Sequence, residues 1–166
     1  MTVTFAVEKL ADIMAEKNQW PTTLNLLLSH WAEVALFKHV MKFNPDFPRY
    51  QQLEREGKLH LVIAREDRKI VGYSVHIIIT RHPHYRHVMT AEENLIYLAP
   101  HLRRKGVHQR MRAFVLKTLT DRQVRIVTAG TMFGHDHDTA LRKMGFEPYQ
   151  IVYACDLTKW KPPIEA

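Results

Sequence analysis

The chain has 166 residues, of which 46% are hydrophobic and 25% are charged, a balance that excludes a mainly disordered protein. No apolar stretch approaches the roughly 20 residues that cross a bilayer, and the single cysteine, Cys155, excludes an internal disulfide and a multi-cysteine zinc site. These features predict one cytoplasmic domain over residues 1–166, with its core over about 4–157, and no membrane partner.

The net charge of +7 lies in one segment. Residues 101–125 contain eight basic side chains and one acidic side chain, Asp121, while acids and bases cancel in the rest of the chain. Such a concentration indicates an anionic partner. The alternative is a solvated helix face that happens to be basic.

The first half of the chain predicts one strand followed by helices. Alternating residues predict the strand, helical spacing of leucines predicts the longest helix, and prolines at 45 and 48 end that helix. In order, we expect a strand over 2–7 and helices over 8–17, about 22–41 and 49–56.

The second half predicts a mixed α/β arrangement with βαβ crossovers. Strands over 59–65 and 70–80 are joined by the polar hairpin 66–69, and a third strand covers 90–98. We then expect a helix over 106–120, a strand over 124–129, a helix over 138–144 and a final strand over 149–157. In that last strand Cys155 is expected to be a buried, inert thiol.

The most specific feature joins the third of these strands to the basic helix. A strand ends, a short basic loop carries Gly106, and a helix begins. The first N–H groups of a helix lack intrahelical acceptors and the macrodipole makes that end positive. Glycine permits close approach of a phosphate, and neighbouring cationic side chains add charge. The loop therefore predicts a pyrophosphate site.

This stretch resembles the acyl-CoA-binding motif of the GNAT superfamily of N-acetyltransferases, R/Q-x-x-G-x-G/A after a strand that ends V-x-P. Here it is Arg103-x-x-Gly106-x-His108 after Leu98-x-Pro100, with His108 in place of a small residue. The Gly145–Phe146 pair that closes the later helix, and Val71–Gly72–Tyr73 in the hairpin, are similar to the family's pattern as well.

The resemblance implies an α/β single-domain GNAT fold, with a mixed central sheet, flanking helices and a splayed acyl-CoA cleft. Three further segments resemble a branch often encoded by bacteriophages, which would place the protein in the host cytoplasm: His30–Trp31–x–Glu33, His84–Tyr85–Arg86 and His135–Asp136–His137.

The resemblance further implies that an acetyl group passes from acetyl-CoA to a primary amine by direct attack. Backbone N–H groups near the end of the strand would hold the thioester carbonyl. The residues expected to bind acetyl-CoA are Leu98, Ala99, Arg103, Arg104, Lys105, Gly106, Val107 and His108.

The general base is expected to be Glu92 or Glu93, because the family often places an acid on this strand. Side chains alternate along a strand, so only one of the two can face the cleft. Glu92 shares its face with Ile96, and Glu93 shares its face with Tyr97. Two solvated glutamates without a catalytic role are the alternative.

The proton donor departs from the family's pattern, since Leu141 stands where many members have tyrosine. Tyr149 is our substitute, with Tyr153, His135 and His137 as further options. The residues expected around the acceptor are Trp31, Glu33, His84 and Tyr85, although Trp31 also suits a core position. No metal is expected, because histidines in two loops do not provide converging ligands.

The sequence is compatible with three functions. The first is an N-acyltransferase for a small amine, a protein lysine or an N-terminus, and the second is a non-catalytic GNAT-fold binding protein, such as a phage accessory or virion protein. The third is nucleic-acid binding, which is disfavoured. Single-strand binders place aromatic residues between their basic ones, and Phe114 is the one aromatic residue in the basic segment. The resemblance also implies a homodimer, since the family often pairs through its last strands.

Overall fold

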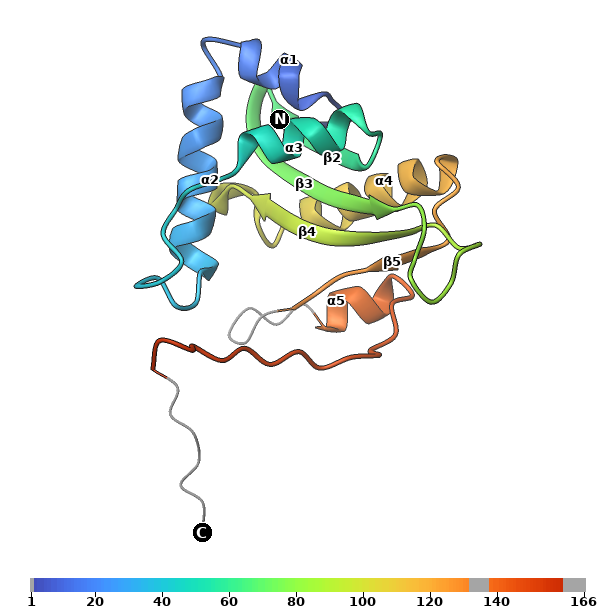
Figure 1. Ribbon diagram of the computed structural model, residues 1–166. Coiled ribbons are helices and arrows are strands. Elements are labelled where there is room, and N and C mark those ends of the chain that lie inside the picture. Colours follow the sequence, from blue (N-terminus) through green and yellow to red (C-terminus); the bar gives the residue numbers. More distant parts are fainter. Residues whose placement is uncertain (1, 132–137, 160–166) are drawn as a thin grey trace.

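Five strands form one mixed sheet in the computed structural model, which describes residues 2–131 and 138–159 (Figure 1). The strands lie in the spatial order β1-β2-β3-β4-β5; the first four are antiparallel neighbours and β5 is parallel to β4. Their bounds are β1 Val3–Val7, β2 Leu59–Glu66, β3 Lys69–Ile79, β4 Thr90–Leu98 and β5 Ile126–Thr128. The predicted mixed α/β sheet is therefore confirmed.

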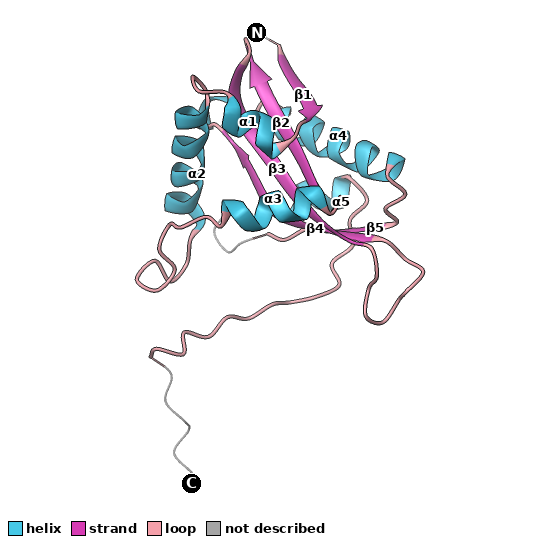
Figure 2. Ribbon diagram, turned by 45° about the horizontal axis from the view of Figure 1, so that its top comes forward, coloured by secondary structure: helices cyan, strands magenta, loops and turns pink. Residues whose placement is uncertain are grey.

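Helices cover both faces of this sheet. One face packs on α1 and α3 through Ile13 and Leu53, and the other packs on α4 through Met111, Val115 and Leu119. The helices are α1 Leu10–Ala15, α2 Trp20–Val34, α3 Phe47–Arg55, α4 Val107–Asp121 and α5 Asp138–Lys143, with a short 3-10 turn at Pro100–Leu102. Figures 1 and 2 place α2 at the side of the sheet where β4 ends, and the β3–β4 loop at the opposite side. No helix of the described ranges is long and apolar enough to cross a membrane.

Helix α2 ends at Val34, seven residues before the predicted end near Met41. The Nζ of Lys38 donates to the carbonyl of Ala32, and the indole N–H of Trp31 donates to the Met41 carbonyl at 3.0 Å. The first bond satisfies a carbonyl of the last helical turn, and the second holds the following chain against the helix. Residues 35–46 consequently form an irregular wall beside the sheet.

Strand β4 contains one residue more than its partner. Val75 pairs with Leu95 and His76 pairs with Glu93, so Asn94 is a bulge. A bulge resets the alternation of side chains, which places Glu93 on the α4 face and Leu95 on the opposite face. The predicted sharing of one face by Glu93 and Tyr97 is wrong, because it assumed an uninterrupted ladder.

The open side of β4 begins where its pairing with β5 stops. β5 pairs only with the start of β4, from Thr90↔Ile126 to Glu92↔Thr128. In the part of the chain that the structure describes, β4 from Glu93 to Leu98 has no strand partner on that edge. Two parallel strands that separate in this way provide the splayed arrangement that the resemblance implied.

The predicted final strand is absent. Residues 149–157 form an extended, largely exposed segment with no strand pairing to any described residue, and Tyr153 is 86% exposed. Cys155 is exposed as well, which contradicts the expected buried thiol. Apolar composition predicted the strand, but a strand also needs a neighbouring edge that supplies its hydrogen bonds.

Gly72 provides a test of how tightly β3 and β4 pack. A Cβ at this position would lie 2.7 Å from the Tyr97 carbonyl oxygen and 2.9 Å from the Leu98 side chain. We expect Gly72→Ala to lower the free energy of unfolding by about 1–3 kcal/mol, since backbone must move to admit the methyl group. Urea denaturation measures this change. Gly130→Ala is the control, because nothing lies within 4 Å of its added Cβ; equal stability of the two variants would contradict the prediction.

Candidate active site

The loop before α4 has the backbone of an anion site. Arg104 and Gly106 both have left-handed φ angles, of 60° and 69°, and Gly106 is the N-cap of the helix. The first intrahelical bond runs from Arg110 N to Gly106 O, so the N–H groups of residues 107–109 have no helical acceptor. A Cβ at Gly106 would meet nothing within 4 Å, which leaves room for a ligand. His108 lies half-buried in this first turn.

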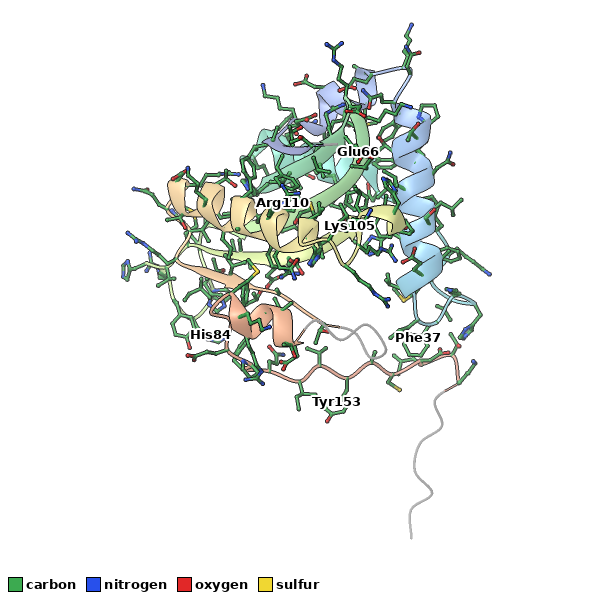
Figure 3. All side chains as sticks on the ribbon, turned by 180° about the vertical axis from the view of Figure 1, so that it is seen from behind. Phe37, Glu66, His84, Lys105, Arg110 and Tyr153 are labelled. Carbon is green, nitrogen blue, oxygen red and sulfur yellow. The ribbon has the colours of Figure 1, made fainter. Side chains whose placement is uncertain are left out.

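The basic segment divides into internal and surface charges. Arg112 is buried and paired with Glu93, and the half-buried Arg122 donates to the Leu59 carbonyl at 3.1 Å. By contrast, Arg104 and Lys105 are exposed beside the helix N-terminus. Figure 3 shows Lys105 at the end of α4 nearest α2. Positive charge therefore remains where the backbone can accept an anion.

Arg103 faces α2 as well as the end of β4. Its guanidinium lies 2.8 Å from the Glu33 carboxylate, and its Nε donates to the Leu98 carbonyl at 2.9 Å. The same group stacks on the ring of Tyr97, 5.1 Å from its centre. Two residues assigned to different ligands, Arg103 to acetyl-CoA and Glu33 to the acceptor, are thus in direct contact.

Tyr97 belongs to the same cluster and was missed by the sequence analysis. Its hydroxyl donates to Glu33 at 2.8 Å, and the ring of His30 stacks on it with centres 4.9 Å apart. Burial, then the hydrogen bond to Glu33 and its negative charge, raise the pKa of Tyr97 against the opposing effect of Arg103, so it stays a protonated donor at neutral pH. Its place directly before Leu98 in the motif was the available signal.

His30 is neutral in this cluster. Its Nδ1 lies 2.8 Å from the hydroxyl of Tyr73, and burial lowers its pKa below the usual value. Because a neutral ring can both donate and accept, the His30–Tyr73 bond needs no ionised group. The pair closes the inner side of the cluster without adding charge.

The two glutamates lie on opposite faces of β4. Glu93 is 5% exposed and 2.9 Å from Arg112, and burial raises its pKa while Arg112 acts against that shift. Glu92 is exposed, lies opposite Ile77 and pairs with Thr128 at the point where β5 leaves β4. Glu92 therefore lies at the opening, the place where β4 and β5 separate, and Glu93 belongs to an internal ion pair.

The other predicted site residues are dispersed. Trp31 is half-buried on α2, whereas His84 and Tyr85 belong to the β3–β4 loop, and Figure 3 shows His84 at the side of the molecule opposite α2. Tyr149 is 76% exposed and no strand orients it. His135 and His137 lie outside the described residues. The structure does not bring the four predicted acceptor residues together.

Two backbone groups were expected to hold the thioester carbonyl, and one of them is already used. The N–H of Ala99 donates to the Val71 carbonyl at 2.8 Å. Successive N–H groups of a strand point to opposite sides, so that of Leu98 points to the open edge of β4. The Leu98 carbonyl, which Arg103 contacts, lies on that edge too. Leu98 fits the expected role and Ala99 does not.

Residues 2–131 and 138–159 contain no group of three or more His, Cys, Asp or Glu side chains that could hold a metal ion. In the β3–β4 loop the ring of His82 stacks on Tyr85, with centres 5.0 Å apart, and the ring of His84 lies tilted beside that of His82. These residues form an aromatic loop cluster.

A second polar cluster lies on the α4 face. The Nδ1 of His60 faces an Arg122 nitrogen at 3.4 Å, which can only donate, so Nε2 carries the proton and donates to Thr118 at 3.0 Å. Burial lowers the pKa of His60 to about 4 and that of His76 to about 3. Both histidines are therefore neutral and internal, and neither is near the opening.

His60 makes stability sensitive to acid. A histidine whose pKa is lowered by folding contributes fully above its unfolded value of about 6.5, and its contribution is lost as the pH falls towards about 4. We expect the free energy of unfolding to fall by at most about 1.4 kcal/mol per pH unit on this account. Urea unfolding at several pH values, with His60→Gln beside the wild type, separates His60 from His76 and Glu93. Parallel pH profiles of the two proteins would contradict the assignment.

The comparisons with known proteins agree with this geometry. A mixed sheet, an open edge of β4 and a basic helix N-terminus at that edge define an α/β fold of the acetyltransferase class. The profile of the acetyltransferase (GNAT) family matches residues 20–146, and the chain belongs to this family. Comparison with curated proteins finds no match.

Solved structures share the fold at low sequence identity. Glucosamine-6-phosphate N-acetyltransferase from Arabidopsis thaliana has a TM-score of 0.70 and 12% identity, over 95% of this chain and 99% of that one. A predicted acetyltransferase with acetyl-CoA from Clostridium acetobutylicum has a TM-score of 0.65 and 14% identity, over 96% and 99%. An aminoglycoside acetyltransferase from an uncultured soil metagenomic sample, in complex with trehalose, has a TM-score of 0.63 and 15% identity, over 94% and 95%.

Proposed function

We propose that this protein transfers an acetyl group from acetyl-CoA to a primary amine by direct attack. The observation that carries the proposal is the loop at residues 103–106: two left-handed residues lead into a helix N-terminus beside exposed Arg104 and Lys105. Backbone N–H groups, a helix dipole and cations together suit a diphosphate. Membership of the GNAT family supports acetyl-CoA as the ligand that carries this diphosphate.

The chain's own residues supply the remaining steps. The N–H of Leu98 stabilises the charge that develops on the thioester oxygen. Glu92 accepts the proton of the amine, directly or through water, while the new N–C bond forms and the C–S bond breaks. The Tyr97 hydroxyl, kept protonated by burial and Glu33, is our donor for the departing thiolate in place of Tyr149. The acceptor amine is left acetylated and CoA leaves as the thiol.

Nucleic-acid binding receives less support from the structure than from composition. Arg112 and Arg122, two of the eight basic residues in the segment, are used inside the protein. A bacteriophage-encoded branch, a homodimer and a cytoplasmic location stay predictions.

The phosphate site is tested by charge removal. We expect the double change Arg104→Ala and Lys105→Ala to weaken acetyl-CoA binding by at least about tenfold, more at low salt than at high salt, because exposed charges are screened. Calorimetric titration at two salt concentrations measures the effect. Arg125→Ala removes an exposed charge from the same segment and serves as the control. Unchanged affinity in the double variant would refute the assignment of the loop.

The base is tested by comparing neighbours. We expect Glu92→Gln to lower turnover by about 10²–10⁴-fold while acetyl-CoA affinity and stability stay unchanged. Glu93→Gln should instead destabilise the fold, because Arg112 would keep a buried charge without its partner. Release of free thiol and thermal unfolding are the two readouts. Normal turnover in Glu92→Gln would show that this carboxylate is not the base.

A further inference from the structure

A large cavity lies on the face of the sheet opposite α4. Its volume is about 810 Å³, and its walls come from α1, α2, residues 35–47, α3, strands β2 to β4 and Ala154 of the extended segment. Six of its apolar lining residues show how many elements contribute: Leu27, Trp31, Phe43, Leu61, Val75 and Leu95. A volume of this size is typical of a site for a small organic molecule, far beyond a packing defect that one or two waters would fill.

The polar groups in the sheet and helix part of its wall are already bonded to protein. His30 and Tyr73 bond each other at 2.8 Å, and the Tyr50 hydroxyl donates to Asn94 at 2.7 Å. A ligand rich in hydroxyl or ammonium groups would lose its hydration here without gaining equivalent partners. The wall therefore favours an apolar occupant.

The charged residues in the described lining come from one short segment, 42–49. Asp46 accepts from the backbone N–H of Arg49 at 3.0 Å and so caps α3, and the Arg49 side chain donates to Gln52 at 2.9 Å. Lys42 adds a further positive charge. The charged side chains of this edge are thus two cations and one carboxylate that already caps a helix, a set that does not favour a polycation.

The cavity shares a face of β4 with the proposed base. Leu95, directly after the bulge, lines the cavity, and so does Ile77, which pairs with Glu92. Residues directly opposite each other in an antiparallel pair point to the same side of the sheet. An amine held at Glu92 can therefore extend its body along this face into the cavity.

We infer that the acceptor is a primary amine carried on a bulky apolar body, arylalkyl or long-chain alkyl, which the cavity binds. The inference rests on the proposed function for the identity of the reacting group. It excludes polyhydroxylated and polycationic amines as preferred acceptors. The cavity selects by burial of apolar surface, and the amine itself stays at the open edge of β4.

Binding without acetyl-CoA tests the cavity on its own. We expect calorimetric titration with butylamine, hexylamine and octylamine to show affinity rising by about fourfold for each added CH₂ group, as apolar surface is buried. Phenylethylamine should also bind, and glucosamine should bind at least about tenfold more weakly than octylamine. Affinity that does not change with chain length, or tighter binding of glucosamine, overturns the inference.

A matched pair of variants locates the binding. Ala35 lines the cavity in an extended conformation, whereas Ala32, one turn earlier in α2, is exposed and is not part of the lining. We expect Ala35→Trp to lower octylamine affinity at least about tenfold and Ala32→Trp to leave it unchanged. Equal affinity in both folded variants overturns the inference. If Ala35→Trp does not fold, the chain-length series of the wild type still decides.

Two further outcomes separate this inference from its neighbours. Tighter binding of octanoyl-CoA than of acetyl-CoA, abolished by Ala35→Trp, together with no octylamine binding, would mean that the cavity holds the donor's acyl chain and would overturn the inference. Failure of acetyl-CoA to bind, with octylamine binding intact, would count against the proposed function and leave the apolar-amine site standing.

Discussion

The extra residue in β4 is the constraint on which the rest of the site depends. Asn94 interrupts the ladder between the pairs His76↔Glu93 and Val75↔Leu95. Without it, Glu93 would point to the same side as Tyr97, and Arg112 of α4 would be buried without its partner. With it, one glutamate neutralises the interior while the other stands at the opening. A single inserted residue thus separates a structural carboxylate from a chemical one.

Glu33, Tyr97 and Arg103 connect the two halves of the proposed site. Glu33 belongs to α2, which forms part of the cavity wall, and Arg103 belongs to the loop that leads to the α4 N-terminus. The guanidinium of Arg103 bonds Leu98 through Nε and Glu33 through one Nη, so a phosphate that took this Nη would compete with Glu33. The acceptor side therefore has a direct physical link to the cofactor side.

The order of elements from β2 to α5 could be predicted from the sequence, because runs of Val and Ile, the loop at Gly106 and the helical spacing after it are local signals. The placement of Glu93, Arg112 and Tyr97 could not. A bulge depends on how two strands pair. Arginine usually lies at the surface, and Arg112 is buried here because the carboxylate of Glu93, from another element, pairs with it. The prediction of a strand over 149–157 was wrong for a related reason. Its composition suits a strand, but no edge of the described sheet pairs with it.

The polar groups on the two faces of the sheet differ in their surroundings. On the α4 face, Glu93 is paired with Arg112 and neutral His60 is bonded to Thr118, so these enclosed groups are unavailable to a ligand. On the other face, Tyr97 and Glu92 stand beside a cavity with apolar walls. A charge placed at that boundary interacts more strongly than it would in bulk water, because the medium on one side screens it less. An apolar acceptor that fills the cavity removes further water from the same boundary. Binding of the acceptor body would then strengthen the interactions of Glu92 with the amine, so recognition and chemistry reinforce each other.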